Sequence, residues 1–149
     1  RSSVLVVVDN NGARSGSESA QLSPTAPGIC TYDGVRAIAT NQDGTLNSPA
    51  NPAARRDVVT VYMTGQGPVA PNWPTGKAAS TVPRILAPTE AHAFVGGVEG
   101  KIEFLGLAPD MVGVLQMNFR PDYLSPLGDQ PLRVRIGRQE SNPGVISIR

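Results

Sequence analysis

The chain has very few of the side chains from which enzymes and metal sites are built. Its 149 residues hold one cysteine, Cys30, and one histidine, His92, and aromatic residues make up 5%. One cysteine cannot close an internal disulfide, and a tetrahedral zinc site here would need mostly carboxylates. A Ser-His-Asp triad would have to use His92, which we interpret as an ordinary strand residue. The composition therefore predicts no enzyme activity, no catalytic residue, no metal site and no cofactor.

Charge and long apolar runs are also scarce. Charged residues make up 17% of the chain and the net charge is +1 at pH 7, which points to no polyanionic partner. No apolar stretch reaches the length of about 18 residues that a membrane-spanning helix needs. We therefore expect neither nucleic-acid binding nor a membrane span. Loops rich in Ser, Thr, Asn, Gly and Pro are typical of extracellular β-proteins, so we expect the protein outside the cell or at the cell surface.

The sequence is instead rich in short strand signals separated by turn residues. The clearest strand is residues 57–64, which are β-branched and aromatic. Others are predicted at 92–95, 101–104, 112–119, 132–136 and 145–148, with a further short one near Ile85. Alternating apolar residues in these strands should be buried, namely members of the set Val59, Val61, Met63, Val114, Gln116, Val134, Ile136 and Ile148. The pattern predicts an all-β fold: an Ig-like β-sandwich over residues 24–149, with an extra N-terminal β-hairpin at residues 1–23.

The two ends of the chain carry similar strand-turn-strand signals. Residues 4–8 and 18–22 flank a turn at 9–12, and residues 132–136 and 145–148 repeat the arrangement. The apolar pattern aligns Val4, Val6, Val8 and Leu22 with Leu132, Val134, Ile136 and Ile148. In this alignment the first turn is two residues longer than the second. The first hairpin therefore looks like the closing hairpin of a domain whose front half is absent.

The N-terminal copy differs from the C-terminal one in being apolar on both faces. The C-terminal strand alternates apolar residues with arginine, as a strand with one wet face should. A lone hairpin is marginally stable in water, and a strand with two apolar faces needs cover on both. We therefore predict that this hairpin is an assembly interface, formed by Val4, Leu5, Val6, Val7, Val8 and Leu22.

Several segments from residue 24 onward resemble one known family. They are residues 26–29, 41–53, 57–67, 104–109, 112–113 and 116–118, followed by the final hairpin, and they occur in the family's order. On these segments the chain is similar to the Ig-like β-sandwich domains found, often at the C-terminus, in large secreted proteins of acidobacteria. The resemblance implies a secreted sandwich entered from a preceding sandwich, whose last hairpin leads into residues 26–29. It implies no catalytic residue, and Cys30 and residues 91–95 depart from the family's commoner apolar pattern.

Two loops carry weaker signals. Residues 41–47 place oxygen ligands at alternate positions, as a calcium loop does, but the glycine is misplaced and no bidentate glutamate follows, so we favour an Asp-Gly turn. Trp73, the only tryptophan, lies in a Pro-rich loop. A loop tryptophan can stack on a sugar ring or a protein partner, and it can equally cap the end of a core. Trp73 is therefore the one candidate ligand contact.

Two function classes follow. The first is a non-enzymatic structural subunit of an extracellular assembly, in which the hairpin docks on a neighbouring copy of the chain and head-to-tail donation builds a filament. The second is a C-terminal accessory module of a larger secreted protein, used for adhesion or for binding a surface glycan or another extracellular protein. A mature N-terminus at Arg1 favours the first class, whereas a chain trimmed from a longer gene favours the second.

Overall fold

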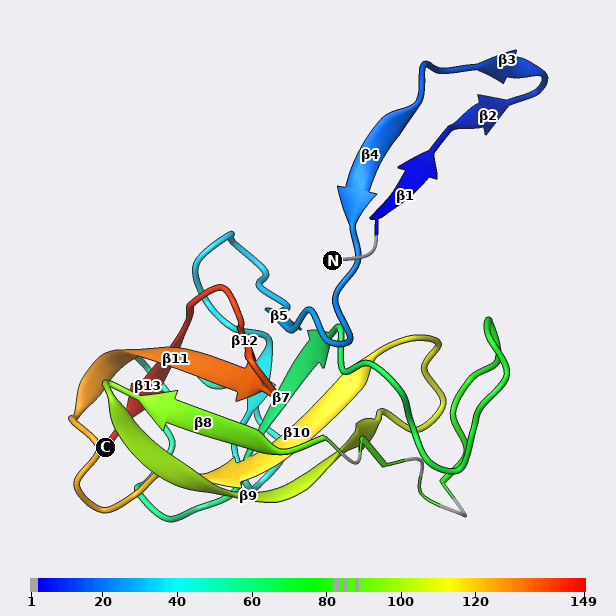
Figure 1. The fold of residues 1–149 in the computed structure, drawn as a ribbon. Helices are drawn as coiled ribbons and strands as arrows, with labels where there is room; N and C mark the ends of the chain where they lie inside the picture. The colour runs from blue at the N-terminus through cyan, green and yellow to red at the C-terminus, as the bar shows by residue number, and fades with distance from the viewer. Residues whose placement is uncertain (1–2, 82–83, 85, 88) are drawn as a thin grey trace.

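The protein consists of strands, turns and loops. The computed structural model describes residues 3–81, 84, 86–87 and 89–149, and no helix occurs among them (Figure 1). The strands are β1 (Ser3–Val6), β2 (Asp9–Asn10), β3 (Ala13–Arg14), β4 (Glu18–Gln21), β5 (Gly28–Ile29), β6 (Ala39–Thr40), β7 (Val59–Thr64), β8 (Ala91–Val95), β9 (Val98–Leu107), β10 (Leu115–Arg120), β11 (Gly128–Ile136), β12 (Gln139–Glu140) and β13 (Gly144–Ile148). The prediction of an all-β fold is confirmed. The strand predicted near Ile85 falls on a residue outside the described ones.

The body of the molecule is a curled antiparallel sheet. Its strands follow the order β12-β11-β8-β9-β10-β7-β5, with β13 also paired to β11 and β6 to β7. The two ends of this path are brought together by the loops between β5 and β7. Arg36 forms a parallel bridge with Val145 of β13, and Ala53 forms another with Ile148. The sheet thus curls around one interior, as Figure 1 shows.

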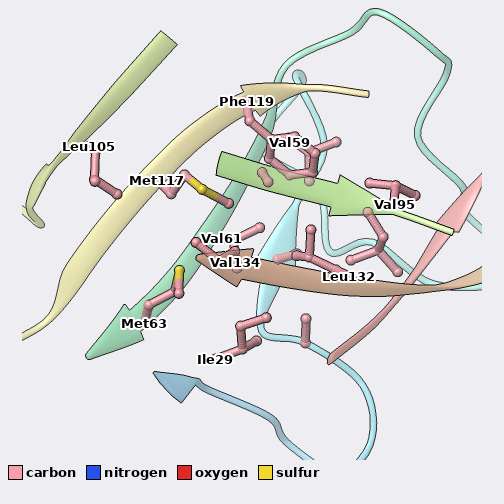
Figure 2. Packing of buried hydrophobic residues seen from close by; sticks show 14 of the residues in the cluster. Ile29, Val59, Val61, Met63, Val95, Leu105, Met117, Phe119, Leu132 and Val134 are labelled. Carbon is pink, nitrogen blue, oxygen red and sulfur yellow. The ribbon is translucent and has the colours of Figure 1, made fainter. Parts of the chain in front are cut away.

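That interior is filled from alternate positions of the long strands (Figure 2). The fully buried side chains there include Val59, Val61 and Met63 of β7, Leu115, Met117 and Phe119 of β10, and Leu132, Val134 and Ile136 of β11. The sequence prediction named the correct buried residues in β7 and β11. For β10 it named residues on the wrong face of the strand. Val114 precedes that strand and Gln116 lies on its opposite, half-buried face. The reason is that Leu115, Met117 and Phe119 offer the larger apolar set, and a period of two lets only one set face the core.

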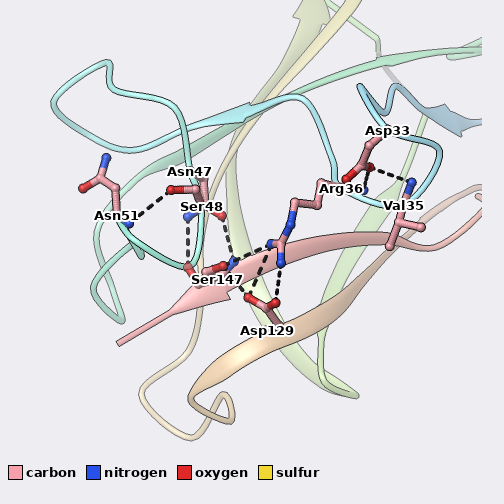
Figure 3. A network of polar contacts seen from close by, with 8 residues as sticks. All are labelled: Asp33, Val35, Arg36, Asn47, Ser48, Asn51, Asp129 and Ser147. Atoms are coloured by element: carbon pink, nitrogen blue, oxygen red, sulfur yellow. Dashed lines mark hydrogen bonds and ion pairs between the residues drawn. The ribbon is translucent and has the colours of Figure 1, made fainter.

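The last three strands form a closing hairpin, residues 128–148, that completes the sheet. On one side β11 pairs with β8, with Leu132 opposite Val95 and Val134 opposite Ala93. On the other side a polar network ties the hairpin to the loops of the first half of the body (Figure 3).

Two residues of the closing hairpin make most of this network. Asp129 accepts hydrogen bonds from the Arg36 guanidinium and from the Ser147 hydroxyl. The backbone of Ser147 exchanges two hydrogen bonds with the amide of Asn47, at 2.7 and 2.9 Å. The contacts of Arg36 and Asn47 join residues that are 93 and 100 positions apart in the sequence. We call this region, where the closing hairpin meets the loops before β7, the seam of the sheet.

The chain enters the body beside the turn of the closing hairpin. The Thr25 hydroxyl is buried and donates to the carbonyl oxygen of Ile136 at 2.8 Å. The next residue, Ala26, donates its N–H to the carbonyl oxygen of Gly65 at 2.9 Å. This anchored linker fixes the point at which the N-terminal segment leaves the body.

Candidate assembly interface

The N-terminal segment forms a two-stranded ladder of its own. Strand β1 pairs with β4 from Ser3↔Gln21 to Val6↔Glu18, and β2 pairs with β3. The turn between them is Asn11-Gly12, with φ angles of 52° and 88°. Two central residues with positive φ define a type I′ turn, for which Asn-Gly is the preferred sequence. We call residues 3–22 the N-terminal hairpin.

This hairpin projects away from the body (Figure 1). Every residue from Ser3 to Pro24 is exposed. The exposed fractions of the predicted interface residues are 41% for Val4, 73% for Leu5, 47% for Val6, 48% for Val7, 63% for Val8 and 52% for Leu22. The predicted interface residues therefore lie together on one element, and the body covers none of them.

Strand alternation divides these residues between two faces. Val4, Val6 and Val8 share one face, and the register places Ala20 of β4 on it, opposite Val4. Leu22 continues this face because it lies two positions beyond Ala20. Leu5 and Val7 point to the other face. We call the first set the apolar face of the hairpin.

The N-terminal hairpin repeats the closing hairpin in the same register. Val6 pairs with Glu18 as Leu132 pairs with Gly144, and Ser3 pairs with Gln21 as Asp129 pairs with Ser147. At the turn, Asp9↔Arg14 corresponds to Arg135↔Glu140. The turns have equal length although they differ in type, since Gly137 alone has positive φ in the second.

A serine latch occurs at the same place in both hairpins. The Val8 N–H donates to the Ser15 hydroxyl at 3.0 Å, and the Ser15 N–H donates back to the Val8 carbonyl at 2.9 Å. Val134 and Ser141 repeat the two bonds at 3.0 and 2.8 Å. Each serine hydroxyl then donates to the carbonyl of the residue after it, at 2.8 Å for Ser15 and 2.7 Å for Ser141.

The register corrects the alignment drawn from the apolar pattern. Val6 corresponds to Leu132 and Val8 to Val134, and the first turn is not longer than the second. Leu22 does correspond to Ile148, as predicted. The first strand was misaligned because Asn10, a polar residue, stands at the position of Ile136. The latch was the missed signal, since Val8 and Ser15 are seven positions apart, like Val134 and Ser141.

Asp9 fixes the turn of the N-terminal hairpin. One carboxylate oxygen accepts the Gly12 N–H and the other accepts the Arg14 Nε–H, each at 2.9 Å. Arg14 and the Gly12 amide together hold the pKa of Asp9 below its usual value. The turn is therefore locally stabilised without help from the body.

Trp73 lies on a different part of the surface. Its indole N–H donates to the carbonyl oxygens of Lys77 and Ala78, both at 3.2 Å. The Lys77 ammonium lies 5.3 Å from the ring centroid, and the indole packs against the small buried cluster of Ala79 and Leu107. Trp73 also lines a groove of about 540 Å³ with Val69 and Val112. The side chain is thus half-buried and already bonded within its own loop.

The remaining polar candidates make local contacts. His92 Nδ1 lies 2.6 Å from a Glu99 carboxylate oxygen, and Cys30 is a half-buried free thiol. In the loop at 41–47, Asp43 accepts two hydrogen bonds from Thr45. Within the described residues no three histidine, cysteine or acidic side chains lie close enough to hold a metal ion.

Comparisons with known proteins return nothing similar. No family model matches the chain, and neither the curated proteins nor the solved structures include a significant match. The family resemblance therefore stays a prediction. In the part of the chain that the structure describes, no helix is long and apolar enough to cross a membrane.

Proposed function

We propose that the chain is a non-enzymatic structural subunit of an extracellular assembly, joined head to tail to its neighbour through the N-terminal hairpin. One observation carries the proposal: an exposed hairpin has the register and serine latch of a second hairpin whose inner face packs into the core of the same molecule. An element built to close a sheet, with an uncovered apolar face, is suited to closing or extending another sheet.

We further propose that the body is an Ig-like sandwich, with residues 24–149 as one module and residues 1–23 as its joint. The pairing of β9 supports this division. Its first residues pair with β8, next to β11, and its later residues pair with β10, next to β7. Strand β9 would therefore link two halves of the sheet, which face each other across a shared core.

The energetics require more than the apolar face alone. Burying the exposed half of Val4, Val6, Val8 and Leu22 contributes about 1 kcal/mol for each side chain. Association costs about 4–15 kcal/mol in lost motion and ordering. New ladder hydrogen bonds, at about 1 kcal/mol each, make up the difference only if the hairpin also pairs along a strand edge. The joint should therefore combine face burial with strand addition.

The experiment compares aspartate substitutions at two neighbouring valines that are nearly equally exposed and lie on opposite faces of the hairpin. Val6 and Val7 are 47% and 48% exposed, and Val7 corresponds to the exposed Arg133 of the closing hairpin. At high concentration, wild type and Val7→Asp should associate into larger species in sedimentation and electron microscopy, with threads if copies join head to tail. Val6→Asp should remain monomeric because it places an unpaired charge in the joint. If the two variants behave alike, the apolar face is not the joint.

A second candidate function is an accessory module for adhesion or glycan binding. The groove beside Trp73 favours it, because an indole ring next to an open groove can stack on a sugar. The test is Trp73→Phe against Trp73→Ala on a panel of polysaccharides. Retention of wild-type binding by Phe and its loss in Ala would support the second function, and equal binding by both variants would contradict it.

A further inference from the structure

Two polar residues interrupt the apolar face of the N-terminal hairpin. Asn10 stands where the closing hairpin has Ile136, and Glu18 stands where it has Gly144. The other core-facing positions keep their apolar character, with Val6 at the place of Leu132 and Val8 at the place of Val134. The two hairpins thus share one register, and among the buried core-facing positions they differ in polarity at these two.

Both points are tightly enclosed in the body of this chain. Gly144 is buried, and a Cβ atom there would lie 2.7 Å from Ile29 Cγ2 and 3.0 Å from Ala37 Cβ. A glutamate side chain has no room at that position and would place its carboxylate among apolar groups. Ile136 is fully buried and pairs with Ala91 of β8, so an asparagine there would lose apolar contact and bury an amide.

The position itself is already filled in every copy. The closing hairpin of each chain pairs along β8 and is tied to the first half of the body by the contacts of Asp129 with Arg36 and of Ser147 with Asn47. Each chain has two hairpins but only one closing-hairpin position, which its own closing hairpin occupies. In an assembly of identical chains, the N-terminal hairpin of each would therefore find no free position of this kind. An incoming N-terminal hairpin would therefore have to displace a better-fitting element that belongs to the same chain.

We propose that Asn10 and Glu18 are the specificity residues of the joint. They bar the hairpin from the closing-hairpin position of a copy. Copies of the pure chain can therefore associate through the hairpin only weakly, by strand addition at an open edge, and the tight acceptor is a different molecule. That acceptor is a sandwich of the same fold and another sequence, without a closing hairpin of its own. It leaves space and a polar partner for Glu18 where this chain has Ile29 and Ala37. This inference rests on the proposed head-to-tail joining.

Residues on the outward face of the N-terminal hairpin also support an acceptor other than a copy of this chain. Asp129, which binds Arg36 in this chain, corresponds to Ser3, and Ser147 corresponds to Gln21. Without the carboxylate, the N-terminal hairpin cannot form the ion pair to an arginine at the position of Arg36. The acceptor therefore needs no arginine at that position.

The test transplants the hairpin within the full chain. In the first chimera, residues 129–148 are replaced by the sequence of residues 3–22, in the register described above. A second chimera is the same except that it keeps Ile136 and Gly144 in place of Asn10 and Glu18. A matched control is the first chimera with Arg133 and Val145 kept instead, two residues on the outward face. Urea unfolding is followed by the fluorescence of Trp73 and by circular dichroism. We expect the second chimera to fold cooperatively, with an unfolding constant at least 100-fold smaller than that of the other two.

Equal stability of the first and second chimeras would overturn the proposal, since Asn10 and Glu18 would then not hinder entry. If no chimera folds, single substitutions in the natural closing hairpin decide. Ile136→Asn and Gly144→Glu should each raise the unfolding constant more than 10-fold, whereas Arg133→Val and Val145→Ser should stay within about 3-fold. Similar effects at all four positions would also overturn it. The association of Val6→Asp and Val7→Asp tests the joining itself, and can fail while the chimera result holds.

Discussion

At the scale of single residues, the serine latch shows how burial changes the energy of one hydrogen bond. Ser141 is 4% exposed and accepts the N–H of Val134, whereas Ser15 makes the same bond in a hairpin open to water. Removing a hydroxyl leaves a donor unsatisfied, which is costly only where water cannot replace the lost partner.

We therefore predict unequal effects for two identical substitutions. Ser141→Ala should lower the free energy of unfolding by about 1–3 kcal/mol, the cost of an unsatisfied buried donor. Ser15→Ala should change the free energy by less than about 0.5 kcal/mol, as exposed substitutions usually do. Urea unfolding of both variants beside the wild type measures the difference. Equal losses would mean that the N-terminal hairpin is covered in solution.

The seam of the sheet gives a pH-dependent prediction. The side-chain hydrogen bond from Arg36, followed by the one from Ser147, holds the pKa of Asp129 below its usual value. A carboxyl whose pKa is lowered by folding stabilises the protein fully above its unfolded pKa, and loses this contribution as the pH falls through the folded pKa.

The stability difference between wild type and Asp129→Asn should therefore be constant from about pH 5 to 8 and shrink below about pH 4. Urea midpoints of the two proteins across this range provide the measurement. Ser3→Ala, a change at the corresponding position of the exposed hairpin, serves as the control and should show no such trend. A difference that persists unchanged to pH 2 would show that the charge of Asp129 is not what matters.

At the scale of elements, the sequence predicted where the strands lie better than it predicted which face of each strand is buried and how the strands pair. Strands β7 and β11 were predicted with the correct buried face because their apolar residues alternate with polar ones over their buried length. Strand β10 also alternates, with Leu115, Met117 and Phe119 buried and polar residues between them, but the predicted strand began at residue 112 and took its phase from Val114, which precedes β10. One apolar residue beyond the end of a strand can therefore shift the buried face that is predicted from an apolar pattern.

The N-terminal hairpin illustrates the same limit. Its predicted interface residues lie together, but Asn10 breaks the apolar series and shifted the alignment with the closing hairpin. Only the hydrogen bonds of Val8 and Ser15 restore the correct pairing. A polar residue at a position where the related hairpin has an apolar one therefore misaligns a comparison that uses apolar residues alone.

The linker is a third element with a testable role. Gly65 has a φ of 78°, and a Cβ atom there would lie 1.8 Å from the carbonyl oxygen of Ala26. Gly65→Ala should lower the free energy of unfolding by more than about 2 kcal/mol, because it combines the left-handed backbone cost with a clash. Gly76→Ala is the matched control, with a φ of 77° and no neighbour within 4 Å, and should cost about 1–2 kcal/mol.

Equal losses in these two glycine variants would show that the linker does not pack against β7 in solution. A larger loss at Gly65 would show that residues 24–28 belong to the folded body. The N-terminal hairpin would then start from a fixed point rather than from a flexible tether.

At the scale of the whole molecule, stability is unevenly distributed. The body buries a continuous core, and its first and last segments are joined by the seam network. The hairpin buries nothing against the body, and its ladder hydrogen bonds are open to water. Local opening is cheapest where buried contacts are few, so the two parts should unfold independently.

A chain that starts at Pro24 should therefore keep the unfolding free energy of the full chain to within about 0.5 kcal/mol, the range of surface changes. In the full chain, hydrogen exchange should be fast for residues 3–22 and slow for 128–148, although the two hairpins share one register. Loss of cooperative unfolding in the shortened chain would contradict this independence. Slow exchange in residues 3–22 that disappears on dilution would instead show that the hairpin is covered by association, the condition under which its apolar face serves as a joint.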